Sequence, residues 1–575
     1  MSDSQNPKAP GEPGKAKKEL SMEQRLLLAF LLMGAVLFLT PYFMPKPTPK
    51  PPQKTPAPPA QKSAESKPVQ KPASRAAPAP ASVGQVSDNQ ERQITVNTDL
   101  YEIRFSNRGA VAKSWQLKKY KDNLGKALDL VNPVSVEKAG AAPFTLAFTG
   151  QKPAADLGQA LYAAKTSPDG LTVEFEFSDG RTLSRKSFQF KKDSYLATFI
   201  SEASGSGAAL PHLVSWRGGF GDATVPKAYA AQHSLYYDSS NSKLVINDHT
   251  AGKDGPVSAG GAFLFAGLED AYFAAVFLPE GTQHLQLDTY SDKHPVEKDS
   301  KEEEPFVGAA VGGSGQNRFS LFVGPKDVDI LRKVNPRLEQ VVDWVWFQLL
   351  AKPLFLTLNW TNDKLIRNYG WSIIVITVVI NFVMLPLKFS SMKSMKKMQE
   401  LQPQIQAINA KYKNIGMRDP RKAQQNQEMM DLYKKAGVNP LGGCVPMLLQ
   451  LPFFIAFYKV LSVAIELRGA PWLWVRDLSQ PEHLPIKVLP LVMIASQFYL
   501  QRMTPTASPD PQQQRIMMLM PLMLGFMFYQ ASSGLVLYWL TGNLVGILQQ
   551  WVINRMGPAP AAVPTPAPKK KGSRK

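Results

Sequence analysis

VNPLGGCVPMLLQLPFFIAFYKVLSVAIELR, residues 438–468, is the stretch that decides the fold class. It opens with turn residues and continues directly into an apolar segment long enough to cross a bilayer. Gln450 and Lys459 interrupt that segment, and a charge pair, Glu466 and Arg468, ends it at what should be a membrane interface. Because polar side chains are costly in lipid, they indicate a protein-lined cavity or pathway. The sequence therefore predicts a membrane protein with a polar site inside the bilayer.

The composition adds a large water-soluble part. A chain of 575 residues with a mean hydropathy of -0.18 is too polar to lie wholly in the membrane. Its net charge of +20 predicts an anionic partner, lipid headgroups or RNA, unless it reflects only cytoplasmic loops and basic tails. The single cysteine, Cys444, excludes an intrachain disulfide. The sequence shows no metal-ligand spacing, P-loop, dinucleotide fingerprint or nucleophile elbow, so no metal, cofactor or catalytic residue is expected.

The first half of the chain predicts an anchor, a linker and a β domain. An apolar run at 26–44 favours an uncleaved transmembrane helix over a signal peptide, because no small-x-small cleavage site follows it. Residues 45–90 are rich in Pro, Ala and Lys and predict an extended linker. From 91 to 330, short alternating stretches are separated by turn residues, which predicts an all-β sandwich. Asp179-Gly180 is a hairpin signal within it.

The second half predicts a helical membrane part. Residues 338–361 mix tryptophans with apolar and a few polar residues, which predicts an amphipathic helix at the membrane interface. Five further apolar segments bring the predicted spans to six. They lie at about 371–387, 445–464, 485–501, 516–531 and 535–553.

The loop 388–435 sets the topology. It holds eleven Lys and Arg residues against four acidic residues, so the positive-inside rule places it in the cytoplasm. Counting spans from this loop also places the N-terminus (1–25) and the basic tail (556–575) in the cytoplasm, with 45–370 on the outer side. The loop predicts a helical hairpin with a Met-rich apolar face. That face either packs on the protein's own bundle or binds varied apolar partners.

Five segments over about 340–555 closely resemble the YidC membrane protein insertases in order, spacing and connecting loops. They are GWSIIVITVVINFVMLPL, MQELQPQIQAINAKY, QEMMDLYKKAGVNPLGGCVPMLLQLPFFIAFY, ELRGAP and SGLVLYWLTGNLVGILQQ. The β region, opening ITVNTDLYEIRFSNRGA, resembles the periplasmic domain of the Gram-negative type.

The resemblance implies a polytopic α-helical protein of the inner membrane, with a five-helix insertase core at 371–555 and a periplasmic β-sandwich. Such a protein inserts nascent membrane proteins and helps them fold, alone or with the Sec translocon. The implied route is a hydrophilic groove that opens to the cytoplasm and to lipid, and no nucleotide or small-molecule substrate is consumed. Partial hydration of a polar segment in such a groove lowers the cost of carrying it across.

The resemblance also implies the groove residues. The family usually carries an arginine four residues after a threonine on the first core span; Thr377 matches, but the arginine position is Asn381. Such a groove stays polar and loses its attraction for acidic substrate flanks. Gln450 matches a polar groove position. Lys459 is interpreted as reaching outward to the interface, with replacement of the missing arginine as the alternative.

Other matched positions concern aromatic residues and contacts with the ribosome. Tyr538 and Trp539 fall on an aromatic pair of the last span, with ordinary helix packing as the alternative. Asp510 matches a position associated with the ribosome or a targeting receptor, with a solvated loop residue as the alternative. Cations of the tail are expected to contact ribosomal RNA. They include Lys569, Lys570 and Lys571.

Two other classes of protein are compatible with parts of the sequence. A transporter or channel would also hold polar residues in a helix bundle, but it usually shows inverted repeats or broken helices in matching halves, and neither is found. A carbohydrate-binding surface protein would rest on the β region alone, by analogy of fold. It leaves the basic hairpin unexplained.

Overall fold

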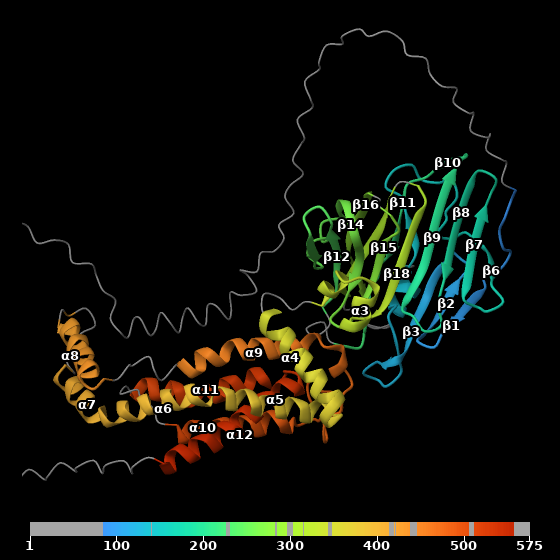
Figure 1. The fold of residues 1–575 in the computed structure, drawn as a ribbon. Helices are drawn as coiled ribbons and strands as arrows, with labels where there is room; N and C mark the ends of the chain where they lie inside the picture. The colour runs from blue at the N-terminus through green and yellow to red at the C-terminus, as the bar shows by residue number, and fades with distance from the viewer. Residues whose placement is uncertain are drawn as a thin grey trace, which may run out of the picture.

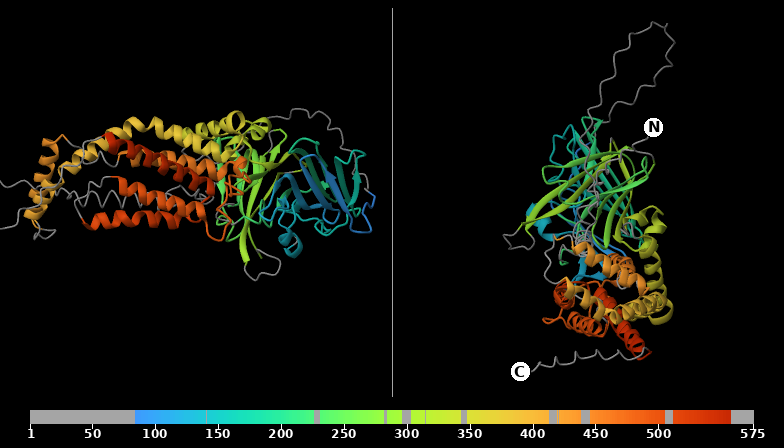
Figure 2. Two further views of the ribbon diagram at one scale, coloured as in Figure 1. Left: turned by 90° about the horizontal axis from the view of Figure 1, so that it is seen from below. Right: turned by 90° about the vertical axis from the view of Figure 1, so that its left-hand side faces the viewer.

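The computed structural model describes residues 84–556 except 140, 226–230, 282–283, 296–302, 314, 343–347, 413–418, 420, 438–444 and 505–510. The β part and the helical part lie end to end along one long axis (Figures 1 and 2). The predicted first span, most of the predicted linker and nearly all of the basic tail lie outside the described residues.

The β part contains a small and a large antiparallel sheet. The small sheet has the order β1 (Gln93–Asn97), β2 (Tyr101–Ser106), β3 (Val111–Lys121), β4 (Ala127–Asp129). The large sheet has the order β5 (Thr145–Ala147), β11 (His212–Trp216), β17 (Glu303–Gly313), β16 (His284–Pro295), β14 (Val257–Glu269), β15 (Phe273–Pro279), β18 (Asn317–Pro325), β9 (Leu196–Gly205), β8 (Thr182–Gln189), β7 (Thr172–Ser178), β6 (Ala163–Thr166). Three strands lie off this path: β10 (Ala208–Ala209), β12 (His233–Asp238) and β13 (Lys243–Asn247).

An aromatic core holds the sandwich together. Phe144 contacts rings from both sheets: its centroid lies 6.5 Å from Phe105 of β2, 4.9 Å from Phe188 of β8 and 5.9 Å from Trp216 of β11. All four rings are buried, and such large apolar surfaces dominate core energetics. The predicted all-β sandwich is confirmed.

The predicted hairpin at Asp179-Gly180 is also confirmed. It joins β7 to β8, with Ser178 paired to Leu183. The Asp179 carboxylate accepts a hydrogen bond from the Thr182 amide at 2.6 Å, and Gly180 has φ of 86°, a conformation in which a side chain would be strained.

Short helices connect the β part to the bundle. They are α3 (Val328–Val334), capped by the Asp327 carboxylate, η1 (Leu338–Val341) and α4 (Gln348–Thr361). The segment η3 (Asn362–Ile366) then leads to Arg367 in a left-handed conformation, and the chain bends by 116° into α5. Within the predicted interfacial helix at 338–361, the described residues form a short 3-10 turn and α4, and α4 packs against the bundle helix α9. The interfacial position stays a prediction.

Each of the five predicted core spans contains a helix. They are α5 (Tyr369–Val383), α9 (Val445–Val463), α10 (Val488–Met503), α11 (Pro511–Phe528) and α12 (Ser533–Met556). Large apolar side chains point away from this bundle: Phe526 is 88% exposed and Val383 75%. A surface of this kind suits lipid. In the described ranges, Ser533–Arg555 is the one helix long and apolar enough to span a membrane alone, and α4 with α5 passes only as a bent pair. The count of six spans stays a prediction.

The basic hairpin projects from the bundle end that is farthest from the β part (Figure 1). It consists of α6 (Leu385–Glu400), α7 (Gln402–Lys411) and α8 (Arg421–Lys435). Met398, Ile405 and Tyr433 form a small core of its own, and Lys411 pairs with Glu428 at 2.6 Å. Part of the predicted Met-rich face is therefore used to hold the hairpin arms together.

Candidate functional site: a buried polar cluster in the helix bundle

Two polar side chains lie on the buried face of α5. Thr377 is fully buried, and its hydroxyl donates to the Ile373 carbonyl at 2.6 Å. Asn381 is 5% exposed, and its Nδ2 donates to the Thr377 carbonyl at 2.8 Å. They share one face because they are four residues apart on a helix. The predicted groove positions therefore point into the bundle, away from lipid.

A lysine that sequence reasoning missed reaches the same place. Lys388, on α6, donates from Nζ to Asn381 Oδ1 at 2.6 Å and is only 9% exposed. Seven residues make almost two helical turns, and helical side chains lean toward the N-terminus, so the lysine stem runs back along the buried face of α5. Asn381 is thus contacted by an ammonium group.

The last helix, α12, adds a fourth polar side chain to this group. Gln549 of α12 donates from Nε2 to the Asn381 carbonyl at 3.3 Å and is buried. We call Thr377, Asn381, Lys388 and Gln549 the Asn381 cluster. Farther along α12, Asn543 donates to Ser496 Oγ of α10 at 3.0 Å. A line of buried polar side chains therefore runs through a bundle whose outer surface is apolar.

Gln450, Tyr538 and Trp539 form a separate group. Gln450 is half-buried and hydrogen-bonds the Tyr538 hydroxyl, and the Tyr538 ring stacks on Phe457 at 4.4 Å between centroids. Trp539 packs edge-on against Phe454 at 5.0 Å. In the described part of the chain, no hydrogen bond joins this group to Asn381. A role of the two aromatic residues in the groove stays a prediction.

The remaining predicted site residues are not part of the cluster. Lys459 lies on α9 and is half-buried; it is Lys388, not Lys459, that donates to Asn381. Asp510 and the tail lysines lie outside the described residues. Over the described ranges, no group of three or more His, Cys, Asp or Glu could hold a metal.

An apolar cleft of about 410 Å³ lies between α5 and α12. Its lining includes Trp371, Ile374 and Val378 from α5, and Leu540 and Leu544 from α12. The same two helices therefore present polar side chains on one face and an apolar cleft on another. A segment with both polar and apolar parts could contact both surfaces at once.

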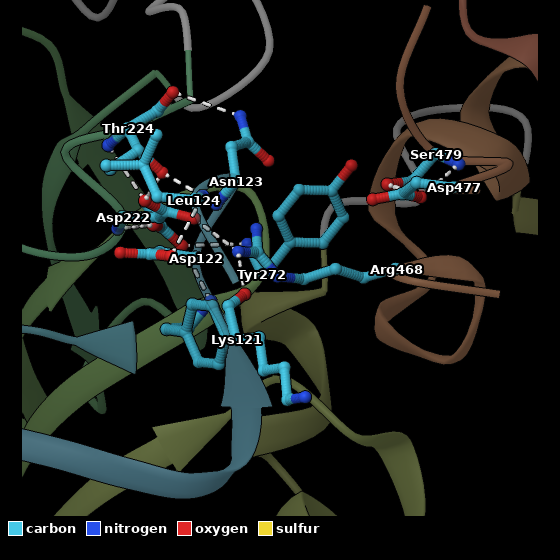
Figure 3. A network of polar contacts seen from close by, with 12 residues as sticks. Lys121, Asp122, Asn123, Leu124, Asp222, Thr224, Tyr272, Arg468, Asp477 and Ser479 are labelled. Carbon is cyan, nitrogen blue, oxygen red and sulfur yellow. Dashed lines mark hydrogen bonds and ion pairs between the residues drawn. The ribbon is translucent and has the colours of Figure 1, made fainter. Parts of the chain in front are cut away.

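A buried ion pair fixes the β part to the bundle (Figure 3). The Arg468 guanidinium, which follows α9, pairs with Asp222 of the β part and donates to the Lys121 carbonyl at 3.0 Å. The two side chains are 5% and 1% exposed. The guanidinium also lies 5.4 Å from the Tyr272 ring centroid. The charge pair expected within 466–468 is thus corrected: Arg468 takes its partner from a different domain.

Because Arg468 pairs with Asp222, it does not pair with Glu466, and the Glu466 carboxyl is buried with a raised pKa. Burial raises the pKa of the Glu466 carboxyl to about 7, and the charges of Asp327 and Asp329 add to the shift against a hydrogen bond from Asn359. The folded state therefore binds the proton more tightly than a solvated loop does. This stabilisation is complete below about pH 4.5 and is lost as the pH rises toward 7.

We expect the docked loop at 465–480 to open more readily at pH 8 than at pH 5.5, by about 2 kcal/mol. Hydrogen exchange of this loop, corrected for the intrinsic effect of pH, measures the difference. Glu466→Gln should abolish it. An unchanged pH dependence in Glu466→Gln would assign the effect to another group.

The fold and the site define a class of membrane protein: a helical core with a buried polar cluster, joined to a large β-sandwich. Two family models match it: the 60Kd inner membrane protein over residues 360–559 and the YidC periplasmic domain over 93–357. The chain belongs to the YidC family of membrane protein insertases.

Individual relatives agree. A membrane protein insertase YidC from Citrifermentans bemidjiense is 33% identical over 568 residues, covering 93% of this chain and 99% of the relative. One from Cupriavidus necator is 36% identical over 506 residues, covering 84% and 87%. A solved structure described as an active YidC insertase is 20% identical, covers 82% of this chain and 95% of its own, and has a TM-score of 0.34.

Proposed function

We propose that this chain inserts integral membrane proteins into the inner membrane and helps them fold. In this proposal, the polar flank of a nascent protein passes along the Asn381 cluster while its apolar segment moves into lipid. The observation that carries the proposal is the cluster itself: four polar side chains are buried on one face of helices whose outward residues are apolar.

The physical reason is the cost of polar groups in hydrocarbon. An unpaired peptide group costs several kcal/mol there, and a charge costs more. Amide and ammonium groups that already point into the bundle can replace part of the water that a passing flank loses. Lowering this barrier needs no covalent step, so family membership and site both support insertion without chemistry on the substrate.

We also propose a topology and a set of partners. The N-terminus, the hairpin and the C-terminus would lie in the cytoplasm, and the β domain in the periplasm, as the eleven cations at 388–435 favour. The hairpin projects from the bundle end away from the β part, which is the side where a ribosome would deliver a nascent chain (Figure 1). Lys569, Lys570, Lys571 and Asp510 would contribute to ribosome contact, and the protein would act alone or with the Sec translocon.

Reconstitution tests the function. Purified full-length protein in liposomes should insert a single-span test protein with no nucleotide present, because the proposed barrier reduction is passive. The readout is protease protection of the translocated segment, with empty liposomes as the control. Insertion that required ATP hydrolysis by this chain would contradict the proposal.

A further inference from the structure

We propose that Lys388 is a carboxylate-binding residue that selects acidic side chains in the polar flank of the nascent protein. The inference rests on the proposed function and names the substrate chemistry that the Asn381 cluster recognises. It also reverses the expectation that a groove with Asn381 in place of arginine lacks a cation.

The hydrogen bonds of the cluster leave donors on Lys388. An ammonium group has three N–H donors, and one of them goes to Asn381 Oδ1. One of the two Nδ2 hydrogens of Asn381 is already used by the Thr377 carbonyl. Asn381 therefore holds the ammonium in place, and the remaining N–H groups of Lys388 are available to a carboxylate.

The charge of Lys388 has no partner in the surrounding helices. The sequences of α5, α9, α10, α11 and α12 contain no Asp or Glu, and no ion pair involves Lys388 in the part of the chain that the structure describes. A buried cation without a counter-ion is destabilising by several kcal/mol. An ionisable residue kept at that cost inside a membrane bundle points to function.

The position of the charge favours a protein carboxylate over a lipid headgroup. Lys388 is buried and hydrogen-bonds Asn381 of α5, which also accepts a hydrogen bond from Gln549 of α12. The outer faces of the helices, by contrast, carry exposed apolar residues such as Val379 and Phe382. Carboxylates bind ammonium through short charge-assisted hydrogen bonds, so an Asp or Glu of the substrate would satisfy the site. After release of the substrate, Asn381 Oδ1 remains as the partner of Lys388.

The test uses full-length protein in liposomes and two single-span substrates that differ only in Glu or Gln in the translocated flank. Lys388→Gln should lower insertion of the Glu substrate about tenfold more than insertion of the Gln substrate, and Lys388→Arg should retain both. Lys397→Gln, an exposed cation on the same helix, is the matched control. An equal loss for both substrates in Lys388→Gln would assign a structural role and overturn the proposal.

A second readout is independent of insertion. A carbodiimide should join the Glu flank of a stalled nascent chain to Lys388 through an amide bond, and mass spectrometry would identify the linked peptides. A Glu flank linked only to other lysines would contradict the proposal. Both assays are repeated in vesicles without anionic lipid, to separate a substrate carboxylate from a lipid headgroup as the ligand of Lys388. If Lys388→Gln reduced insertion only with anionic lipid, and equally for both substrates, the ligand would be a headgroup. If wild-type protein inserted neither substrate, the proposed function would fail instead.

Discussion

Replacing Arg468 by methionine should release the β domain from the membrane core. Methionine keeps much of the apolar contact with Tyr272 but leaves the Asp222 carboxylate buried and without its cation. Removing one partner of a buried ion pair costs about 4 kcal/mol. Hydrogen exchange in the loops at 121–124 and 465–480 should accelerate about 100-fold or more.

Arg476→Met is the matched control, because Arg476 is exposed in the same loop. The double variant Asp222→Leu with Arg468→Met should lose less than the sum of the single variants, since it leaves no unpaired buried charge. Exchange that stayed at the wild-type rate in Arg468→Met would show that the ion pair does not hold the domains together.

Asn381→Leu should impair insertion strongly. Leucine has the same number and branching of side-chain heavy atoms as asparagine, but it removes the acceptor of Lys388 and dries the centre of the cluster. We expect the insertion rate of every substrate to fall about tenfold or more. Asn381→Arg places a second buried cation beside the Lys388 ammonium, so it should be tolerated only together with Lys388→Gln, and that double variant should favour acidic flanks.

Val379→Leu supplies the control for Asn381→Leu. Val379 lies on the same helix, is 55% exposed and faces away from the cluster. The insertion rate is measured in liposomes at equal protein density. If Asn381→Leu inserted all substrates at the normal rate, Asn381 would be a packing residue, and Gln450 and Thr377 would be the next candidates for the polar pathway.

Local periodicity made much of the fold predictable. The alternation of β7, TVEFEFS, buries Val173 and Phe175 and exposes Glu174, and so identifies a strand of a sandwich. Long apolar runs likewise indicated where the five core helices lie. The bend after α4 was not predictable, because it depends on a short π segment and on Arg367 in a left-handed conformation, which the sequence does not signal.

The site was predictable only in part. Thr377 and Asn381 were found because a family pattern marks their spacing. Lys388 was counted among the cations of the loop 388–435, because the apolar run before it ends at about 387. In the structure α6 begins at Leu385, and Lys388 in its first turn reaches back to Asn381. Gln549 lies in an apolar run, and one sequence does not tell a buried polar residue from one that faces lipid.

The interface between the domains shows a different limit. Arg468 and Asp222 are 246 residues apart in the chain. No local pattern relates two such positions, so the sequence offered only the nearer Glu466 as a partner. Contacts of this kind depend on the tertiary fold and were beyond reasoning from periodicity or spacing.

Photocrosslinking from inside the bundle tests the central claim most directly. A photoreactive amino acid at position 549, next to Asn381, is compared with one at Val379 on the outer face of α5, each in full-length protein with a stalled single-span nascent chain. The account predicts that position 549 crosslinks to the polar flank and Val379 to lipid or to the apolar segment. Crosslinks to the polar flank from Val379 and none from position 549 would contradict passage along the Asn381 cluster.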